Sequence, residues 1–193
     1  MKFLSYLLFL MFFYQNISAQ TQNICYGAVK DYSVDLTDGA TGTPNSTYAW
    51  TVVETTFSGS ISGKVTAAVV NANAIIINWN TTPAGNYTLR VVETNNGCSG
   101  SQNLTIIINP LPTITGTLSA CAGSTTQLSG STIPNATNPW TSSDTAIATI
   151  SSSGLVTGLS AGTTTITYTN SKGCTIVASV TIAALTTSPI NFN

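Results

Sequence analysis

Short runs that alternate apolar and polar residues, separated by turn residues, constrain the fold of this chain most strongly. In the run 87–91, Tyr87, Leu89 and Val91 share one face of an extended chain, while Arg90 points the other way. The same alternation recurs at 48–52 and 163–169. A period of two with turn residues between the runs is typical of half-buried antiparallel strands. Because helix-favouring patterns are nearly absent, the sequence predicts an all-β protein.

A proline-bearing break divides the chain into two parts. The segment Asn109-Pro110-Leu111-Pro112 carries two prolines in three residues, which cannot donate ladder hydrogen bonds and which stiffen the backbone. The sequence therefore predicts two tandem antiparallel β-sandwiches, at residues 20–110 and 111–185. Residues 186–193 have no periodicity, and we expect a flexible tail there.

The N-terminus has the pattern of a secretory signal peptide. Lys2 precedes an apolar run at 3–14, and a polar stretch ending in Ala19 follows. This order of a positive start, a short apolar core and a small residue predicts a signal peptide at 1–19, cleaved after Ala19. A retained membrane anchor is the alternative, but the run is shorter than the ~20 residues that a span needs. We expect a secreted or cell-surface protein with no membrane span after cleavage.

Four cysteines in an exported chain predict disulfides, and they are Cys25, Cys98, Cys121 and Cys174. Four cysteines allow three pairings, between which sequence alone does not choose. The same plan occurs twice, however: an early cysteine, then a Gly-Cys just before the last strand of the part. We therefore predict the pairs Cys25–Cys98 and Cys121–Cys174, one in each sandwich. Metal ligation and redox chemistry are the alternatives, although no C-x-x-C motif is present.

Charge is sparse, and this excludes several classes of function. Five basic and six acidic residues give a net charge of −1, which argues against a surface for nucleic acid or an anionic membrane. The chain has no histidine, the commonest general base and metal ligand. Its only glutamates, Glu54 and Glu93, each follow a strand run rather than sharing an evident cleft. We therefore predict that the protein is not an enzyme.

The second part resembles the bacterial Ig-like domain of group 2, over about residues 113–183. The segments that carry the resemblance are WTSSD (140–144), AIATI (146–150), GLVTG (154–158), AGT (161–163) and ITY (166–168). Trp140, Ile147 and Val156 would contribute to the core, and Gly154 and Gly158 would form tight turns.

The first part, over about residues 23–110, looks like the PKD-like and Ig-like repeats of large surface proteins from gliding, type IX-secreting bacteria. The segments that carry this resemblance are YAW (48–50), INW (77–79), AGNYTL (84–89) and NNGC (95–98). The acidic-glycine loop of typical PKD domains is missing, so the resemblance implies the sandwich rather than that exact family. Both resemblances together imply two tandem immunoglobulin-like antiparallel β-sandwiches with a role in spacing and adhesion.

Three candidate sites compete with plainer structural interpretations. Asp31, Asp35 and Asp38 are a candidate calcium site, against a solvated turn; no other cofactor is expected. Asp144-Thr145-Ala146 resembles a short bacterial O-glycosylation signal, which makes Thr145 a candidate modification site. Trp79 is a candidate sugar-stacking residue, against a place in the core.

We expect a non-catalytic extracellular structural or adhesion module of a bacterial cell-surface assembly, acting as a spacer or a protein-interaction domain. Its partners would be other cell-surface proteins or repeats of the same kind. One alternative is a carbohydrate-binding module that binds glycans. The other is a self-assembling surface-filament subunit that polymerises by strand addition.

Overall fold

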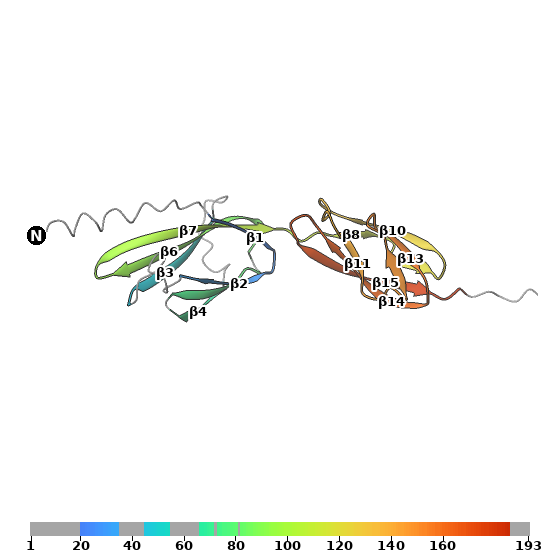
Figure 1. Cartoon of the computed structure of the whole chain (residues 1–193), viewed down its shortest axis with the longest axis horizontal. Helices are drawn as coiled ribbons and strands as arrows, with labels where there is room; N and C mark the ends of the chain where they lie inside the picture. The colour runs from blue at the N-terminus through green and yellow to red at the C-terminus, as the bar shows by residue number, and fades with distance from the viewer. Residues whose placement is uncertain (1–19, 35–44, 55–65, 72, 81, 186–193) are drawn as a thin grey trace, which may run out of the picture. The chain divides into compact units, whose positions relative to one another are not determined.

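A computed structural model describes residues 20–34, 45–54, 66–71, 73–80 and 82–185, and throughout these residues every regular element is a β-strand. The first strand set comprises β1 (Gln20–Cys25), β2 (Val29–Ser33), β3 (Thr47–Glu54), β4 (Thr66–Asn71), β5 (Ala74–Asn78), β6 (Gly85–Asn95) and β7 (Cys98–Asn109) (Figure 1). The second set comprises β8 (Ile114–Gly116), β9 (Ser119–Cys121), β10 (Thr125–Gly130), β11 (Trp140–Ser142), β12 (Ala148–Ile150), β13 (Leu155–Gly158), β14 (Gly162–Thr169) and β15 (Thr175–Ala183). The all-β prediction is confirmed.

Each strand set forms two sheets, and the order of strands is the same in both sets. The first set has the sheets β1-β7-β6-β3 and β2-β5-β4. The second has β9-β15-β14-β11 and β8-β10-β13-β12, in which β8 is an additional edge strand. Strand for strand, β9-β15-β14-β11 repeats β1-β7-β6-β3, and β10-β13-β12 repeats β2-β5-β4. The chain therefore contains the same sandwich topology twice, as predicted for two immunoglobulin-like sandwiches.

The core of the second set lies between its two sheets. Trp140 pairs with Tyr168 across β11 and β14, and their rings pack with centroids 4.5 Å apart. Side chains from both sheets complete the cluster: Leu128, Ala148, Val156, Ile166, Val180 and Ile182. Gly130 is required beside Tyr168, because a Cβ at this position would overlap the tyrosine ring. The predicted core position of Trp140 is confirmed.

The core of the first set follows the predicted alternation of β6. Tyr87, Leu89 and Val91 are buried and Arg90 is exposed. Ile106 and Ile108 of β7, in the same sheet as β6, are also buried. The other sheet contributes the buried residues Ile75 and Ile77 of β5. Strand β3 pairs with β6 over its whole length, from Thr47 opposite Thr94 to Glu54 opposite Tyr87.

The described residues group into two compact units. Unit 1 takes residues 20–22, Val29–Trp79 and Gly85–Ile107, and unit 2 takes Asn23–Ala28, Asn80–Ala84 and 108–185. The segment that ends β1 thus belongs with the second set. Across the described part of the chain, no helix is long and apolar enough to cross a membrane. The predicted signal peptide at 1–19 and the tail at 186–193 lie outside the described residues.

Candidate functional site

The most distinctive chemical feature of the described chain is a disulfide between Cys25 and Cys174, which lie 149 positions apart in the sequence. Their Cα atoms are 5.5 Å apart, within the range that the bond requires. Both cysteines belong to unit 2, because Asn23–Ala28 groups with the second strand set. Cys98 and Cys121 are unpaired and exposed. The predicted pairs Cys25–Cys98 and Cys121–Cys174 are therefore wrong.

Strand length explains why the predicted pairs do not form. The residue after Cys25, Tyr26, donates its backbone N–H to the carbonyl of Asn109 at the end of β7 (2.9 Å). Cys98 is the first residue of β7, so at roughly 3.3 Å per residue it lies about 36 Å away along the strand. In the second set, Cys121 lies opposite Ala183 at the end of β15, whereas Cys174 lies just before β15 begins. In each set, the early cysteine (Cys25 or Cys121) and the cysteine that follows a glycine (Cys98 or Cys174) thus lie at opposite ends of the last strand.

On one side of the disulfide, the turn between β14 and β15 is organised by Asn170. This buried residue accepts hydrogen bonds at Oδ1 from the backbone N–H groups of Lys172 (3.0 Å) and Cys174 (2.9 Å). Its own backbone N–H donates to the carbonyl of Cys174 (3.0 Å), and Gly173 takes a φ of +78°. Cys174 is therefore held at the turn by two hydrogen bonds to Asn170 and is fully buried.

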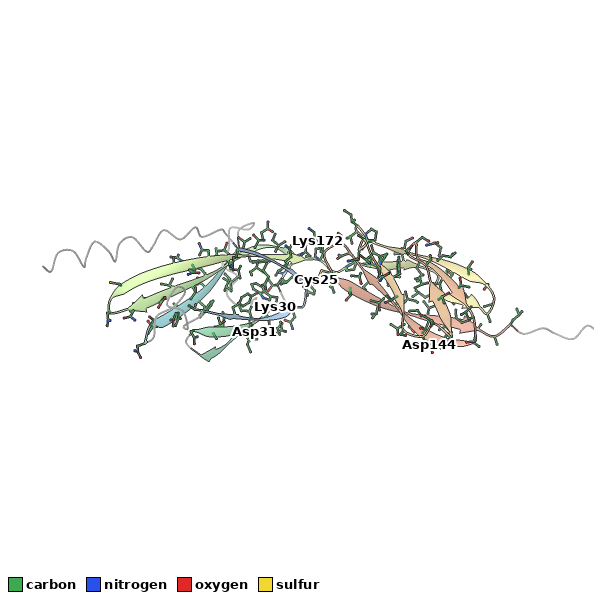
Figure 2. All side chains as sticks on the ribbon, viewed as in Figure 1. Cys25, Lys30, Asp31, Asp144 and Lys172 are labelled. Atoms are coloured by element: carbon green, nitrogen blue, oxygen red, sulfur yellow. A yellow bond between two sulfur atoms is a disulfide. The ribbon has the colours of Figure 1, made fainter. Side chains whose placement is uncertain are left out.

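On the other side of the disulfide, Cys25 ends β1 and begins a tight turn (Figure 2). The N–H of Ala28 donates to the carbonyl of Cys25 (3.1 Å), and Gly27 takes a φ of +85°. Asn109 supports this turn, because its Nδ2 donates to the carbonyl of Ile24 (3.1 Å). Both halves of the disulfide are thus built on turns shaped by glycine and asparagine.

Trp79 does not offer the predicted sugar-stacking surface. Its side chain is 0% exposed, and its Nε1 donates a hydrogen bond to the hydroxyl of Tyr32 (3.2 Å). The ring also packs against Tyr87, with centroids 5.9 Å apart. A stacking platform must expose a ring face, so the prediction of a binding role for Trp79 is wrong and the residue belongs to the core. Trp50 of β3 is half-buried.

The buried hydroxyl of Tyr32 completes this aromatic cluster. It donates to Oε1 of Gln22 (3.0 Å) while accepting from Trp79. Burial raises the pKa of Tyr32 above 10.0, the hydrogen bond from Trp79 lowers it, and the negative charge of Asp31 raises it further. Tyr32 was not predicted as a core residue, although alternation along the run 29–33 allows this one aromatic side chain to face inward.

The candidate calcium residues divide between the described and undescribed parts of the chain. Asp31 lies exposed on β2 beside Lys30 (Figure 2), and Asp35 and Asp38 lie outside the described residues. Within the part of the chain that the structure describes, no group of three His, Cys, Asp or Glu residues is placed to hold a metal ion. The calcium site stays a prediction.

The candidate glycosylation residue Thr145 is exposed in the turn between β11 and β12. Asp144 (Figure 2) shapes this turn, because its Oδ1 accepts a hydrogen bond from the backbone N–H of Ala146 (2.9 Å). The neighbouring hydroxyl of Thr164 accepts from the backbone N–H of Asp144 (3.0 Å). Thr145 is accessible, and its modification stays a prediction.

The two glutamates do not meet at one site. Glu93 lies opposite Tyr48, while Glu54 lies opposite Tyr87, six residues further along the same strand pair. At roughly 3.3 Å per residue, their backbone positions are about 20 Å apart, beyond the ~10 Å of paired-carboxylate glycosidases. Glu93 is engaged instead with Ser46, whose hydroxyl donates to its Oε1 (2.6 Å).

Comparisons with solved structures find immunoglobulin-like proteins. A C-terminal fragment of intimin, in complex with the intimin-binding domain of the translocated intimin receptor, is 21% identical with a TM-score of 0.46, over 80% of this chain and 58% of that one. The titin domains Z1Z2 in complex with telethonin are 13% identical with a TM-score of 0.34, over 86% and 92%. A SusE-like surface polysaccharide-binding protein of Bacteroides thetaiotaomicron is 16% identical with a TM-score of 0.41, over 85% and 33%.

This chain therefore spans 58% of the intimin fragment and a third of the SusE-like protein. No curated protein sequence matches the chain. The resemblance of residues 23–110 to PKD-like repeats of type IX-secreted proteins stays a prediction. The resemblance of the second part is confirmed: residues 113–182 match the family model of the bacterial Ig-like domain (group 2).

Proposed function

We propose that this protein is a non-catalytic extracellular structural module of a bacterial cell-surface assembly, acting as a spacer or a protein-interaction domain. The observation that carries the proposal is the Cys25–Cys174 disulfide within a repeated all-β sandwich topology. Disulfides persist in oxidising compartments such as the cell surface and are rare in the cytosol. The predicted signal peptide at 1–19 and the bacterial Ig-like match at 113–182 support the same location.

The position of the disulfide suits a spacer. It closes a span of 149 positions, which in the chain-entropy model removes about 5 kcal/mol of unfolded-state freedom as an upper figure. Cys174 is fully buried, so the bond is shielded from reductants on that side. A part that must stay folded outside the cell, away from chaperones, gains directly from such a cross-link.

Carbohydrate binding is not proposed, because its candidate residue Trp79 is 0% exposed. The chain also has no histidine, and its two glutamates are separated along the β3–β6 pair. These features favour a protein that contacts its partners through strands and turns over one that catalyses a reaction in a cleft.

The proposal is tested by locating the full-length chain in a bacterium that expresses it. Intact cells are treated with protease, and the released peptides are mapped without reduction. We expect a mature chain that begins at Gln20, release from intact cells, and a linked peptide pair containing Cys25 and Cys174. A variant lacking residues 2–19 is the matched control and should stay inside the cell. Recovery of the full-length chain in the cytoplasm, with its thiols reduced, would overturn the proposal.

A further inference from the structure

The two unpaired cysteines occupy the same structural positions as the two bonded ones. Cys121 ends β9 as Cys25 ends β1, and each of these strands lies beside the last strand of its set. The hydrogen bonds also match. Ala122 N–H donates to the carbonyl of Ala183 at the end of β15 (2.9 Å), as Tyr26 N–H donates to Asn109 at the end of β7.

The turn after each early cysteine is the same as well. Ser124 N–H donates to the carbonyl of Cys121 (3.0 Å), as Ala28 N–H donates to that of Cys25 (3.1 Å). The intervening glycines Gly123 and Gly27 have φ values of +82° and +85°. Cys121 is therefore the equivalent of Cys25 in both its strand and its turn.

Cys98 is likewise the equivalent of Cys174. Each follows a glycine of positive φ, Gly97 at +83° and Gly173 at +78°, in the turn between the last two strands of its set. Cys98 opens β7, and Cys174 directly precedes β15. Each strand set thus carries one early cysteine and one Gly-Cys at opposite ends of its last strand.

The bonded pair shows which of these positions join. Cys25, the early cysteine of the first set, is bonded to Cys174, the Gly-Cys of the set that follows. By the same rule Cys121 requires the Gly-Cys of a following set, and Cys98 requires the early cysteine of a preceding one. A second copy of this chain supplies both, and both thiols are exposed.

We propose that Cys121 of one copy forms a disulfide with Cys98 of a second copy, so that copies join in series into a covalent chain. This goes beyond a spacer role and shares with it only the requirement for export. Linkage rests on cysteine pairing, and strand addition at a sheet edge is not needed for it.

The chemistry is thiol–disulfide exchange, and it balances with an external disulfide oxidant. The Cys121 thiolate attacks an oxidant RSSR, such as oxidised glutathione or a protein dithiol oxidase, and forms a mixed disulfide while releasing one RS⁻. The Cys98 thiolate of the second copy then attacks the Cys121 sulfur and releases the second RS⁻. Two thiols are oxidised, one RSSR is reduced to two RSH, and the two thiol protons pass to the leaving groups.

The test uses two complementary variants of the mature chain, Cys98→Ser and Cys121→Ser, with tags of different mass. Each is exported and purified with Cys25–Cys174 intact, incubated with oxidised glutathione alone or mixed, and analysed on a non-reducing gel. We expect each variant alone to remain largely monomeric and the mixture to give a heterodimer that reductant dissolves. The unmodified chain should give a ladder of dimers, trimers and longer species.

Two controls separate specific linkage from random thiol collision. The double variant Cys98→Ser/Cys121→Ser should stay monomeric and keep its stability. Adding Ser152→Cys to it places one thiol on another exposed turn, and this chain should not cross-link to the Cys98→Ser variant. Homodimers as abundant as heterodimers, a monomeric unmodified chain, or a Cys98–Cys121 bond within one chain on peptide mapping would each overturn the proposal.

Discussion

The two strand sets share one topology but place their large aromatic residues differently. In the second set, Trp140 and Tyr168 are direct partners across β11 and β14, with ring centroids 4.5 Å apart. In the first set, the buried tryptophan is Trp79, which follows β5 and packs on Tyr87 of β6 at 5.9 Å. The same sheet order is therefore compatible with a tryptophan from either sheet, because the interior requires volume and close packing rather than one particular anchor.

The cysteines differ between the sets in a second way. Equivalent positions hold a bonded cysteine in one place and an exposed thiol in another. The local turns are alike, so the turn itself does not determine which cysteines are bonded. Local structure thus places each sulfur, and contact with a second cysteine decides whether it is bonded.

The largest difference in unfolding free energy is expected between variants of the bonded cysteines and variants of the unpaired cysteines. Replacing Cys25 and Cys174 together with serine should cost up to about 5 kcal/mol of unfolding free energy, because the unfolded chain regains the freedom of a long loop. Replacing Cys98 and Cys121 together should change it by less than about 0.5 kcal/mol, since both are exposed. Guanidinium unfolding of the two double variants measures both effects. Equal losses in the two variants would contradict this view of the cysteines.

The aromatic cores should be disrupted separately. Trp79→Ala and Trp140→Ala should each cost about 3–5 kcal/mol, because each removes a large buried side chain and leaves a cavity. Trp50→Ala should cost less, since that side chain is half-buried. Hydrogen exchange read by mass spectrometry should show lost protection in β6 for the first variant and in β14 for the second. Equal loss in both strands for either variant would show that the two cores unfold as one.

A smaller contrast concerns two tyrosine hydroxyls. Tyr32→Phe leaves the N–H of fully buried Trp79 without its partner, at a cost of about 1–3 kcal/mol. Tyr168→Phe removes a hydrogen bond of 3.0 Å to the carbonyl of Thr132, an exposed residue that water can reach, so we expect about 0.5–1.5 kcal/mol. Thermal unfolding of both variants beside the unmodified chain compares them. A larger loss for Tyr168→Phe would argue that the Thr132 contact is the more important.

The smallest expected effect is a dependence on alkaline pH that comes from the first set. Burial raises the pKa of Tyr32 above its unfolded value of 10.0, so the folded state holds this proton more tightly than the unfolded chain. Its contribution to stability is complete below pH 10 and is lost as pH rises through the folded pKa. Stability should thus fall less steeply above pH 10 in Tyr32→Phe than in the unmodified chain, as measured by urea unfolding between pH 8 and 11. Parallel curves would rule out this role for Tyr32.

Much of the fold could be predicted from the sequence because it depends on local pattern. The period-two runs placed β3, β6 and β14 and identified Tyr87, Leu89 and Val91 as core residues. The segments WTSSD, AIATI and GLVTG identified the second sandwich. The repeated Gly-Cys also located two of the four sulfurs at equivalent turns, since glycine is needed where the backbone takes a positive φ.

The pairing of the cysteines and the burial of Trp79 were decided only by the tertiary structure. The sequence showed that each part has an early cysteine and a Gly-Cys, but not that a strand about 30–36 Å long separates them. Periodicity likewise could not place Trp79, because it follows β5 rather than lying within the strand. Local patterns determine which residues form strands and turns. Disulfide formation and the burial of an aromatic side chain depend instead on which distant segments the fold brings together.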